Sequence, residues 1–367
     1  MRILIDYRPA LRERTGVGEY IHHLAQALAT GTEADPDTTV TLFSSSWRHR
    51  LAPNVIAGAE TVDGRVPVRC LNWLWHRADW PPIERLAGPC DIAHSPHPLL
   101  MPSTQAARFV TIHDLDFLAH PERTAAEVRR DYPSLVARHA NRADRVIVSS
   151  SYAASLVHGR LGVPTSRIVR WPSGAPAWTP RAEPVYDGHI LFIGSLTPRK
   201  NLPTLVRAYR ALLGRRPAAP DLVLAGPIPP GATRTLGPID TAPLCDKLRV
   251  LGYVDAPARR RLYAGASMLV LPSLDEGFGM PVLEAMTAGV PVIASTRGAL
   301  PDLVGDAGLL IDPEDEAALA AAMTQVLDDR SFADTTTARG LARAARYDWR
   351  TTARTLLGAY ADVLRER

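Results

Sequence analysis

The chain has 367 residues, with 46% hydrophobic and 22% charged residues and a formal net charge of +4. This length exceeds one ordinary domain of roughly 100–200 residues and suits two, and no apolar run approaches the ~20 residues of a membrane-spanning helix. The amino terminus lacks the features of a secretory signal, so we expect a cytoplasmic protein; the mild positive charge is also compatible with peripheral attachment to the inner face of a membrane. The basic residues are scattered, which argues against nucleic acid as a partner.

Cysteine usage points to a chain without disulfides or structural metal. Cys70, Cys90 and Cys245 are odd in number and far apart, and none has a metal-ligand spacing. We therefore expect three reduced thiols and no zinc site.

Short apolar runs alternate with longer helical patterns throughout the chain, which is typical of βαβ units and parallel sheets. In the first half, strands are expected at residues 3–6, 40–43, 91–94, 109–113, 146–149 and 168–171. In the second half, they are expected at residues 190–193, 222–225, 250–253, 268–271, 291–294 and 309–311. Each set is large enough for its own doubly wound α/β sheet.

The segment 171–180, dense in proline and glycine, separates the two sets and predicts a linker. We therefore predict domains at 1–174 and 181–348. The tail at 349–367 has the pattern of an amphipathic helix, which we expect to pack back onto the first domain.

Two features of the first half are candidates for ligand contact. Gly16 and Gly18 precede a helix expected from about Glu19, and glycines at such a turn let the backbone approach a phosphate. The pattern is not a dinucleotide-binding fingerprint, and a purely structural turn is the alternative. His113 ends a predicted strand, where it can hydrogen-bond a sugar hydroxyl or the reaction centre, although strand-end histidines are commonly structural.

The second half opens with a basic segment directly after its first predicted strand. Arg199 and Lys200 can neutralise a diphosphate there and stabilise the charge that develops on it as a leaving group. The alternative is a pair of exposed bases in front of a helix capped by Asn201.

The most informative segment is 276–284, between a buried strand pattern and a helical pattern. Gly277 and Gly279 permit close backbone approach to a ligand, and the free N–H groups of a helix start can hold an anion. Glu276 falls at the strand end, where ligands of open α/β sheets gather. Glu284 falls in the expected first helical turn, where its carboxylate can accept hydrogen bonds from ribose hydroxyls. Solvated acids beside an ordinary helix are the alternative.

Taken together, these residues resemble the large family 4 of retaining glycosyltransferases, over nearly the whole chain. The most specific shared feature is a pair of glutamates separated by seven residues around an internal Gly-Phe-Gly. The features that occur in family order are Gly16 and Gly18, His113 with Asp114, and the segments 172–174, 198–201, 276–284 and 347–349. The resemblance implies the GT-B fold: two Rossmann-like, doubly wound α/β domains with a cleft between them.

The resemblance also implies roles for individual residues. Arg199 and Lys200 would bind the diphosphate, Glu284 the ribose, and Glu276 the transferred sugar, which His113 would contact from the first domain. The implied catalytic set is His113, Arg199, Lys200 and Glu276. The implied donor-binding set is Gly16, Gly18, Val254 (through its backbone, at the base), Gly277, Phe278, Gly279, Met280 and Glu284.

By the same resemblance, the reaction retains the anomeric configuration and needs no metal or other cofactor. Two cationic side chains would supply the electrostatic role that a metal plays elsewhere. No carboxylate is obviously placed as a nucleophile, so we take front-face displacement as the hypothesis, with the departing phosphate assisting deprotonation of the acceptor. One departure concerns Ser195, which occupies a position where many members have arginine. Arg199 is the candidate to replace it.

The tryptophan-rich stretch 73–75, the strand end at 91–94 and Pro102 resemble a subgroup that contains bacterial mannosyltransferases and rhamnosyltransferases. We interpret the tryptophans as core residues rather than as a membrane contact. The subgroup favours GDP-mannose as donor, with UDP- and dTDP-sugars as alternatives. The acceptor would be a glycan, a lipid-linked glycan or a small metabolite.

Two other functions stay open at this point. A nucleotide-sugar epimerase or hydrolase of the same fold would turn over the donor without an acceptor. A degenerate sugar-nucleotide-binding subunit would only support an active partner.

Overall fold

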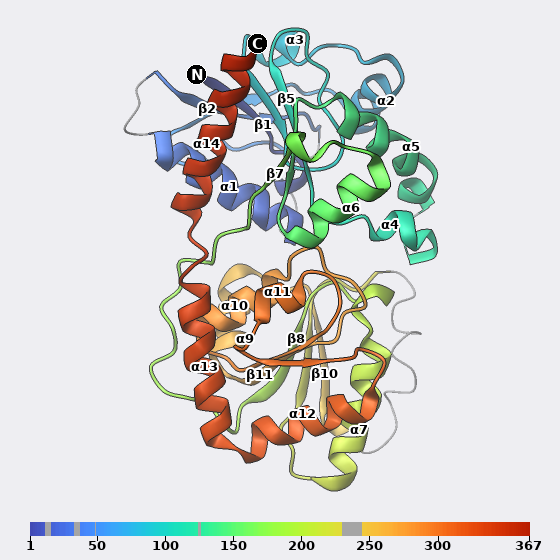
Figure 1. The fold of residues 1–367 in the computed structure, drawn as a ribbon, viewed down its shortest axis with the longest axis vertical. Coiled ribbons are helices and arrows are strands. Elements are labelled where there is room, and N and C mark those ends of the chain that lie inside the picture. Colours follow the sequence, from blue (N-terminus) through green and yellow to red (C-terminus); the bar gives the residue numbers. More distant parts are fainter. Residues whose placement is uncertain (12–15, 33–36, 48, 124–125, 230–243) are drawn as a thin grey trace. The chain divides into compact units, whose positions relative to one another are not determined.

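The computed structural model describes residues 1–367 except 12–15, 33–36, 48, 124–125 and 230–243. The chain divides into two compact units (Figure 1). Unit 1 comprises Met1–Gly174 and Asp348–Arg367, and unit 2 comprises Ala175–Tyr347. Each has its own parallel sheet and its own hydrophobic core, so each is described by itself.

Unit 1 is built on a seven-stranded parallel sheet with the order β3-β2-β1-β4-β5-β6-β7. The strands are β1 (Arg2–Asp6), β2 (Thr39–Ser44), β3 (Ala59–Asp63), β4 (Ile92–Ser95), β5 (Ala107–Ile112), β6 (Arg145–Val148) and β7 (Ile168–Arg170). All but β3 coincide with predicted strands to within two residues. β3 escaped prediction because it is an edge strand whose residues are only partly buried, so it needs no apolar run.

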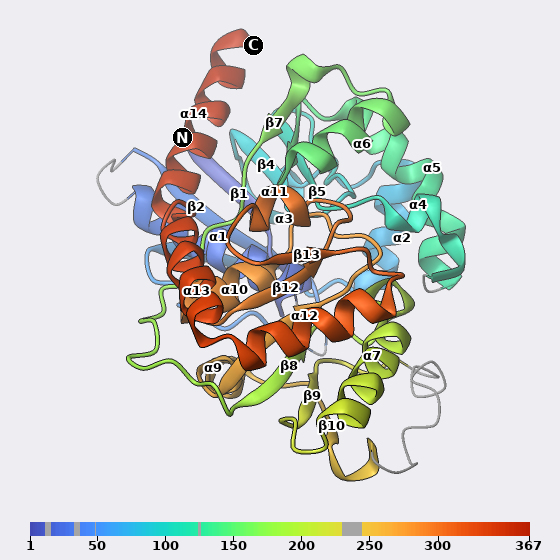
Figure 2. The same ribbon diagram turned by 60° about the horizontal axis from the view of Figure 1, so that its bottom comes forward.

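The C-terminal helix completes unit 1. Helix α14 (Trp349–Glu366) packs against α1 (Gly16–Thr32), and both ends of the chain lie on this unit (Figures 1 and 2). Tyr360 of α14 is fully buried, and its hydroxyl lies 2.6 Å from Nδ1 of His94 at the end of β4. The other helices are α2 (Val68–Ala78), α3 (Glu84–Ala87), α4 (Asp116–Ala119), α5 (Ala126–Arg142) and α6 (Ser151–Leu161).

The two tryptophans of the 73–75 stretch lie on different sides of helix α2. Trp75 is 2% exposed and packs beside Phe43 in the smallest of the three core clusters of this unit, whereas Trp73 is 63% exposed. The interpretation of both as core residues is therefore wrong for Trp73. The two residues lie two positions apart, so on a helix they point in different directions.

Unit 2 is built on a six-stranded parallel sheet with the order β10-β9-β8-β11-β12-β13. Its strands are β8 (His189–Ile193), β9 (Leu222–Ala225), β10 (Leu248–Gly252), β11 (Ala266–Leu271), β12 (Val292–Ser295) and β13 (Leu309–Ile311). The central strand β11 is buried at every position, because parallel sheets are covered on both faces. All six strands were predicted.

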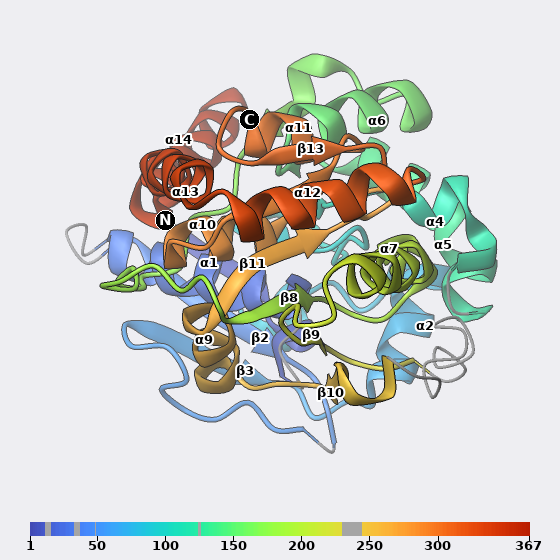
Figure 3. The same cartoon turned by 90° about the horizontal axis from the view of Figure 1, so that it is seen from below.

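The helices of unit 2 cover its sheet in two groups. Helix α7 packs beside α12, whereas α10 packs with α9 and α13 (Figure 3). The bounds are α7 (Leu202–Arg215), α9 (Ala256–Ala264), α10 (Met280–Ala288), α11 (Leu300–Val304), α12 (Glu316–Asp328) and α13 (Arg330–Ala344). Between β7 and β8 the chain forms no helix or strand, and the boundary between the units falls within this stretch.

Candidate functional site

The sheet of unit 2 has a topological switch point between β8 and β11. From β8 the chain moves outward to β9 and β10, and it then returns to β11 on the other side of β8. At such a point a crevice opens outside the carboxyl ends of the strands, where open α/β sheets bind their ligands. Arg199 and Lys200 follow β8, and Glu276 follows β11.

Lys200 and Glu276 form a buried ion pair at this switch point. Nζ of Lys200 donates to Oε1 of Glu276, and the two side chains are 9% and 7% exposed. The hydroxyl of Ser273 donates to the same oxygen at 2.7 Å. Nη1 of Arg199 lies 3.8 Å from Oε2 of Glu276 and donates to the Asp275 carbonyl at 3.3 Å. Two cations and one carboxylate therefore form a single cluster.

Backbone contacts hold this cluster in place. The N–H of Leu274 donates to the Arg199 carbonyl at 2.8 Å, which joins the segments after β8 and β11. The N–H of Ala299 donates to the Glu276 carbonyl, also at 2.8 Å. Gly298 permits this approach, because its φ is +63° and a Cβ there would lie 2.4 Å from the Glu276 carbonyl oxygen.

The electrostatics of the cluster keep Glu276 ionised. Burial alone would raise the pKa of its carboxyl group, but the charges of Lys200 and Arg199 and the hydrogen bonds from Lys200 and Ser273 lower the pKa below its usual value. A buried carboxylate with two adjacent cations provides both an acceptor for sugar hydroxyls and positive charge for phosphate oxygens.

Asn201 does not cap a helix in the expected way. It precedes α7 with φ 55° and makes no capping hydrogen bond; its Nδ2 donates to the Pro313 carbonyl at 2.6 Å instead. The alternative of two exposed bases is wrong for Lys200, which is 7% exposed. Ser195, at the position where an arginine was expected by resemblance, lies in the same segment after β8.

Gly277 to Gly279 form the loop that enters α10, which begins at Met280. Gly279 is the N-cap residue with φ 103°, and a Cβ there would lie 2.6 Å from Cδ2 of Leu300. Met280 is the first residue of α10, and the ring of Phe278 packs edge-on against Tyr347 at 5.9 Å. Within the described residues, no hydrogen bond is formed by the N–H of Met280, as befits a helix start that can hold an anion.

Glu284 is the fifth residue of α10, which begins at Met280, so it lies just beyond the first turn rather than within it. It is 6% exposed, and its Oε1 lies 3.6 Å from Nε of Arg259 in α9. Burial first, and then the charge of Glu284, raise the pKa of the neighbouring Tyr263 hydroxyl, which stays protonated. Val254 lies between β10 and α9, so it borders the same edge of the sheet.

In unit 1, the predicted glycines lie within a helix rather than before it. Helix α1 begins at Gly16, so Gly16 and Gly18 form its first turn. A Cβ at Gly16 would meet no atom of the described residues within 4 Å. Packing within the described structure therefore does not explain the glycine at this position. Thr15, which directly precedes these glycines, lies outside the described residues.

His113 directly follows β5 and contacts α1. Its ring meets that of Tyr20 edge-on at 4.5 Å. Burial lowers the pKa of His113 to about 4, although the charge of Asp114 and a hydrogen bond with the Pro96 backbone oppose the shift. The imidazole is therefore neutral near pH 7. Its buried Nε2 has no hydrogen-bond partner among the described residues, which is unusual for a buried polar atom.

Sequence reasoning missed three side chains of the unit 2 site: Ser273, Arg259 and Tyr263. The sequence does not single out Arg259, because its pairing with Glu284 depends on how α9 packs against α10. Ser273 lies two residues after β11, and this strand-end position was the available signal.

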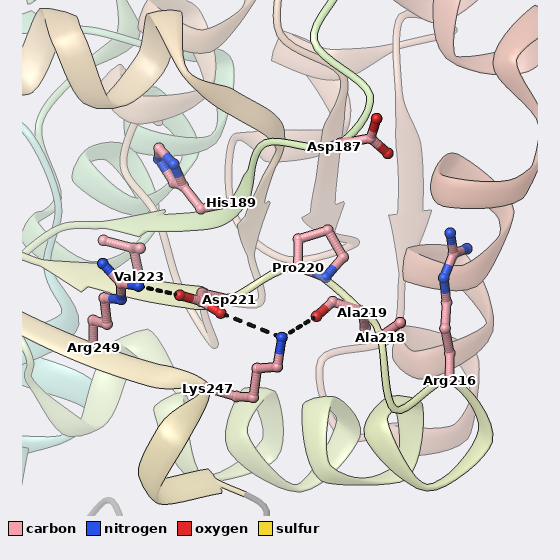
Figure 4. Close-up of a pocket in the computed structure, with 10 residues that line it drawn as sticks. All are labelled: Asp187, His189, Arg216, Ala218, Ala219, Pro220, Asp221, Val223, Lys247 and Arg249. Atoms are coloured by element: carbon pink, nitrogen blue, oxygen red, sulfur yellow. Dashed lines mark hydrogen bonds and ion pairs between the residues drawn. The ribbon is translucent and has the colours of Figure 1, made fainter.

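A polar pocket lies at the opposite, amino-terminal edge of the same sheet. It has a volume of about 470 Å³ and is lined by residues that include Asp221, Lys247 and Arg249 (Figure 4). Asp221 lies 2.6 Å from Nη2 of Arg249 and 3.6 Å from Nζ of Lys247. Asp221 offsets only part of this positive charge, but ligands of such sheets gather at the other edge, so we do not assign the site here.

Two further properties concern metals and membranes. Among the described residues, no three His, Cys, Asp or Glu side chains are grouped closely enough to hold a metal ion. No described helix combines the length and the apolar character needed to cross a bilayer.

Comparisons with known proteins identify the family. Residues 14–177 match the family model described as Glycosyltransferase Family 4, and residues 187–329 match the one described as Glycosyl transferases group 1. The O-antigen chain mannosyltransferase B of Escherichia coli is 31% identical over 281 residues, which cover 73% of this chain and 74% of that protein. The chain belongs to glycosyltransferase family 4. It is a glycosyltransferase, as the resemblance predicted.

This family 4 glycosyltransferase is also similar to another curated relative and to solved structures. The D-inositol 3-phosphate glycosyltransferase of Acidothermus cellulolyticus is 29% identical over 411 residues, covering 98% of this chain and 88% of that protein. Sucrose-phosphate synthase from Thermosynechococcus elongatus superposes with a TM-score of 0.80 at 21% identity, over 100% and 99% of the two chains. HepE of Anabaena, solved with UDP and glucose, gives a TM-score of 0.72 at 18% identity over 99% and 100%. These similarities and the two Rossmann-like sheets establish the GT-B fold.

Proposed function

We propose that this glycosyltransferase retains the anomeric configuration and moves a hexosyl group, with GDP-mannose as the first choice of donor. The observation that carries the proposal is the buried cluster of Arg199, Lys200 and Glu276 at the switch point of unit 2. The mannosyltransferase relative supports the choice of sugar.

In the proposed reaction, the diphosphate of the donor binds to Arg199 and Lys200. These cations stabilise the negative charge that develops as the bond between the anomeric carbon and the phosphate oxygen breaks. The N–H groups at the start of α10 add to this stabilisation. We also propose that the reaction needs no metal ion, since two cationic side chains supply the positive charge that a metal would provide.

Glu276 is proposed to accept hydrogen bonds from hydroxyls of the transferred sugar, and Glu284 from those of the ribose. Lys200 and Ser273 orient the carboxylate of Glu276, whereas Arg259 lies beside that of Glu284. The unpartnered Nε2 of His113 is proposed to hydrogen-bond the sugar. The acceptor hydroxyl attacks from the side of the departing phosphate, which takes its proton, so the configuration is retained.

The acceptor is proposed to be a glycan, a lipid-linked glycan or a small metabolite. The names of the relatives supply two concrete classes to test, a mannose-containing polysaccharide and an inositol phosphate. These two acceptor classes are chosen from sequence similarity to the relatives. The charged cluster described above does not help to choose between them, because acceptor selection depends on side chains outside it.

The experiment is a transfer assay with GDP-mannose, UDP-glucose and dTDP-rhamnose, each with mannan oligosaccharide, with inositol 3-phosphate and without acceptor. The proposal expects acceptor-dependent transfer with GDP-mannose and an α-configured product by NMR. Donor turnover that is equally fast without acceptor would favour the hydrolase. An inverted product would contradict retention.

A further inference from the structure

Tyr20 of α1 is the side chain that packs against His113 in unit 1. It is the fifth residue of α1 and is 2% exposed. Its ring meets the imidazole of His113 edge-on, with the ring centroids 4.5 Å apart and the planes at 82°. The ring of Tyr20 is itself bordered by those of Trp171, at 6.2 Å, and Trp349, at 6.0 Å. Tyr20 is therefore held in place by its neighbours, and its ring limits the rotation of the imidazole beside it.

Pro96 determines which ring nitrogen of His113 carries the proton. It follows β4, the strand next to β5, and its backbone forms a hydrogen bond with the His113 ring. Because proline has no backbone N–H, this contact uses the carbonyl oxygen of Pro96, which only accepts. Nε2 of His113 has no hydrogen-bond partner among the described residues, so Nδ1–H is the group that donates to Pro96. Since burial lowers the pKa of His113 to about 4, the ring is neutral near pH 7 and Nε2 can only accept.

The next step rests on the role proposed above for His113. We propose that Tyr20 is a positioning residue: its ring and the Pro96 carbonyl hold the imidazole of His113 in the Nδ1-protonated form, so that Nε2 accepts a hydrogen bond from a hydroxyl of the transferred sugar. A sugar hydroxyl can donate this bond, whereas an ionised diphosphate has no O–H to donate. The same reasoning gives the diphosphate to Arg199 and Lys200, which only donate.

Tyr20 also connects His113 with the start of α1. Gly16 and Tyr20 lie four residues apart, and they therefore share one face of the helix. No described atom lies within 4 Å of a Cβ added at Gly16. A ligand that approaches the backbone of Gly16 would thus lie one helical turn from the residue that holds His113. The two predicted ligand contacts of unit 1 are far apart in sequence but have this structural support in common.

The first test is nitrogen NMR of the histidine side chains in the full-length protein, near pH 7 and without ligand. The signal of His113 is assigned by its absence in His113→Gln. We expect the wild type and Tyr20→Phe, which keeps the ring, to show a protonated Nδ1 and an unprotonated Nε2. Tyr20→Leu is expected to show a mixture of the two neutral forms, because the imidazole can then turn away from Pro96.

The second test is kinetic and asks whether Tyr20 acts through His113. In transfer from GDP-mannose, Tyr20→Leu should lower kcat about 10–100-fold and change KM for the donor less than about threefold, because a misplaced group costs rate more than binding. Tyr20→Phe should stay within about twofold of the wild type. In a His113→Gln background, Tyr20→Leu should lower kcat further by less than about twofold, since the residue through which it acts is already lost.

Tyr209→Leu is the matched control for loss of a buried tyrosine. Tyr209 is fully buried in α7 of unit 2, and the change should alter kcat of the folded protein less than about twofold. Melting temperatures show which variants are folded. Tyr20→Met replaces Tyr20→Leu in both tests if the latter does not fold.

Three results would overturn the proposal. They are a protonated Nε2 of His113 in the wild type, wild-type kcat in a folded variant that lacks the Tyr20 ring, or a loss that adds in full to that of His113→Gln. The NMR measurement needs no donor, so it separates the two proposals. A wild type that shows the Nδ1-protonated form but transfers no sugar would contradict the proposed function and leave the positioning of His113 by Tyr20 supported.

Discussion

At the residue scale, Glu276 is the side chain on which the proposed chemistry most depends. Replacing it by glutamine keeps the shape and removes the charge that balances Lys200 and Arg199. We expect kcat for sugar transfer to fall about 10²–10³-fold, as when a preorganised electrostatic group is removed. Glu314→Gln, an acid 77% exposed in unit 2, is the matched control. Unchanged turnover of Glu276→Gln in a folded protein would refute its assigned role.

Gly16 offers a separate test in unit 1. No described atom lies where a Cβ would be added, and the residue is helical, so Gly16→Ala should leave the melting temperature unchanged or raise it. If the proposal is right that a ligand approaches this backbone, the same change lowers the rate of transfer. Gly159→Ala is the control, since Gly159 lies within α6 and is equally open. Equal activity of both variants would show that Gly16 serves no ligand.

Some site residues were predictable because strand ends mark ligand positions in parallel sheets. Arg199, Lys200 and Glu276 were inferred from their places after apolar runs, and the structure brings the three into contact. Arg259 and Ser273 were not predicted, because their contacts with the glutamates arise only when the elements pack. Tertiary pairing of this kind leaves no spacing signal along the chain.

At the element scale, the strands were the most predictable part of the fold. Twelve of the thirteen described strands lie where apolar runs placed them, since strands covered on both faces must be apolar throughout. Helix starts were less accurate. Helix α1 begins at Gly16 although glycine is a weak helix former, because burial of Tyr20 and Ile21 stabilises the helix through tertiary packing.

The attachment of α14 to the sheet of unit 1 should depend on pH. His94 is fully buried, with Nδ1 2.6 Å from the Tyr360 hydroxyl and Nε2 2.9 Å from that of Thr111. Burial, and then the neighbouring His97 and His113, lower the pKa of His94 to about 3. The unfolded chain therefore binds the proton first on acidification, so stability is lost as the pH falls below about 6.5.

The expected loss from His94 is about 1 kcal/mol between pH 7 and pH 5.5. Urea unfolding of the wild type and of His94→Gln at both pH values measures it. The variant should be less stable at pH 7 but less sensitive to pH, whereas the exposed His120→Gln should match the wild type. An identical pH dependence in His94→Gln would contradict the assignment.

At the scale of the whole molecule, each Rossmann-like unit contributes predicted site residues at the carboxyl edge of its own sheet. Unit 2 supplies the charged cluster and α10, and unit 1 supplies His113 and the start of α1. The assignment of the family and of the fold rests on agreement between these strand-end motifs, the strand orders and the relatives. The central claim is that the donor diphosphate binds at the carboxyl edge of unit 2.

The sequence contains two lysines, and they allow a direct test of that claim. Lys200 lies at the carboxyl edge of the unit 2 sheet, and Lys247 lies in the pocket at its amino-terminal edge (Figure 4). The measurement is calorimetric titration of GDP, with UDP and dTDP in parallel, into the wild type, Lys200→Met and Lys247→Met. The account predicts that Lys200→Met weakens nucleotide diphosphate binding about 10–100-fold, as expected for loss of a charged hydrogen bond, and that Lys247→Met binds like the wild type. Full affinity in a folded Lys200→Met variant, or a loss confined to Lys247→Met, would contradict it.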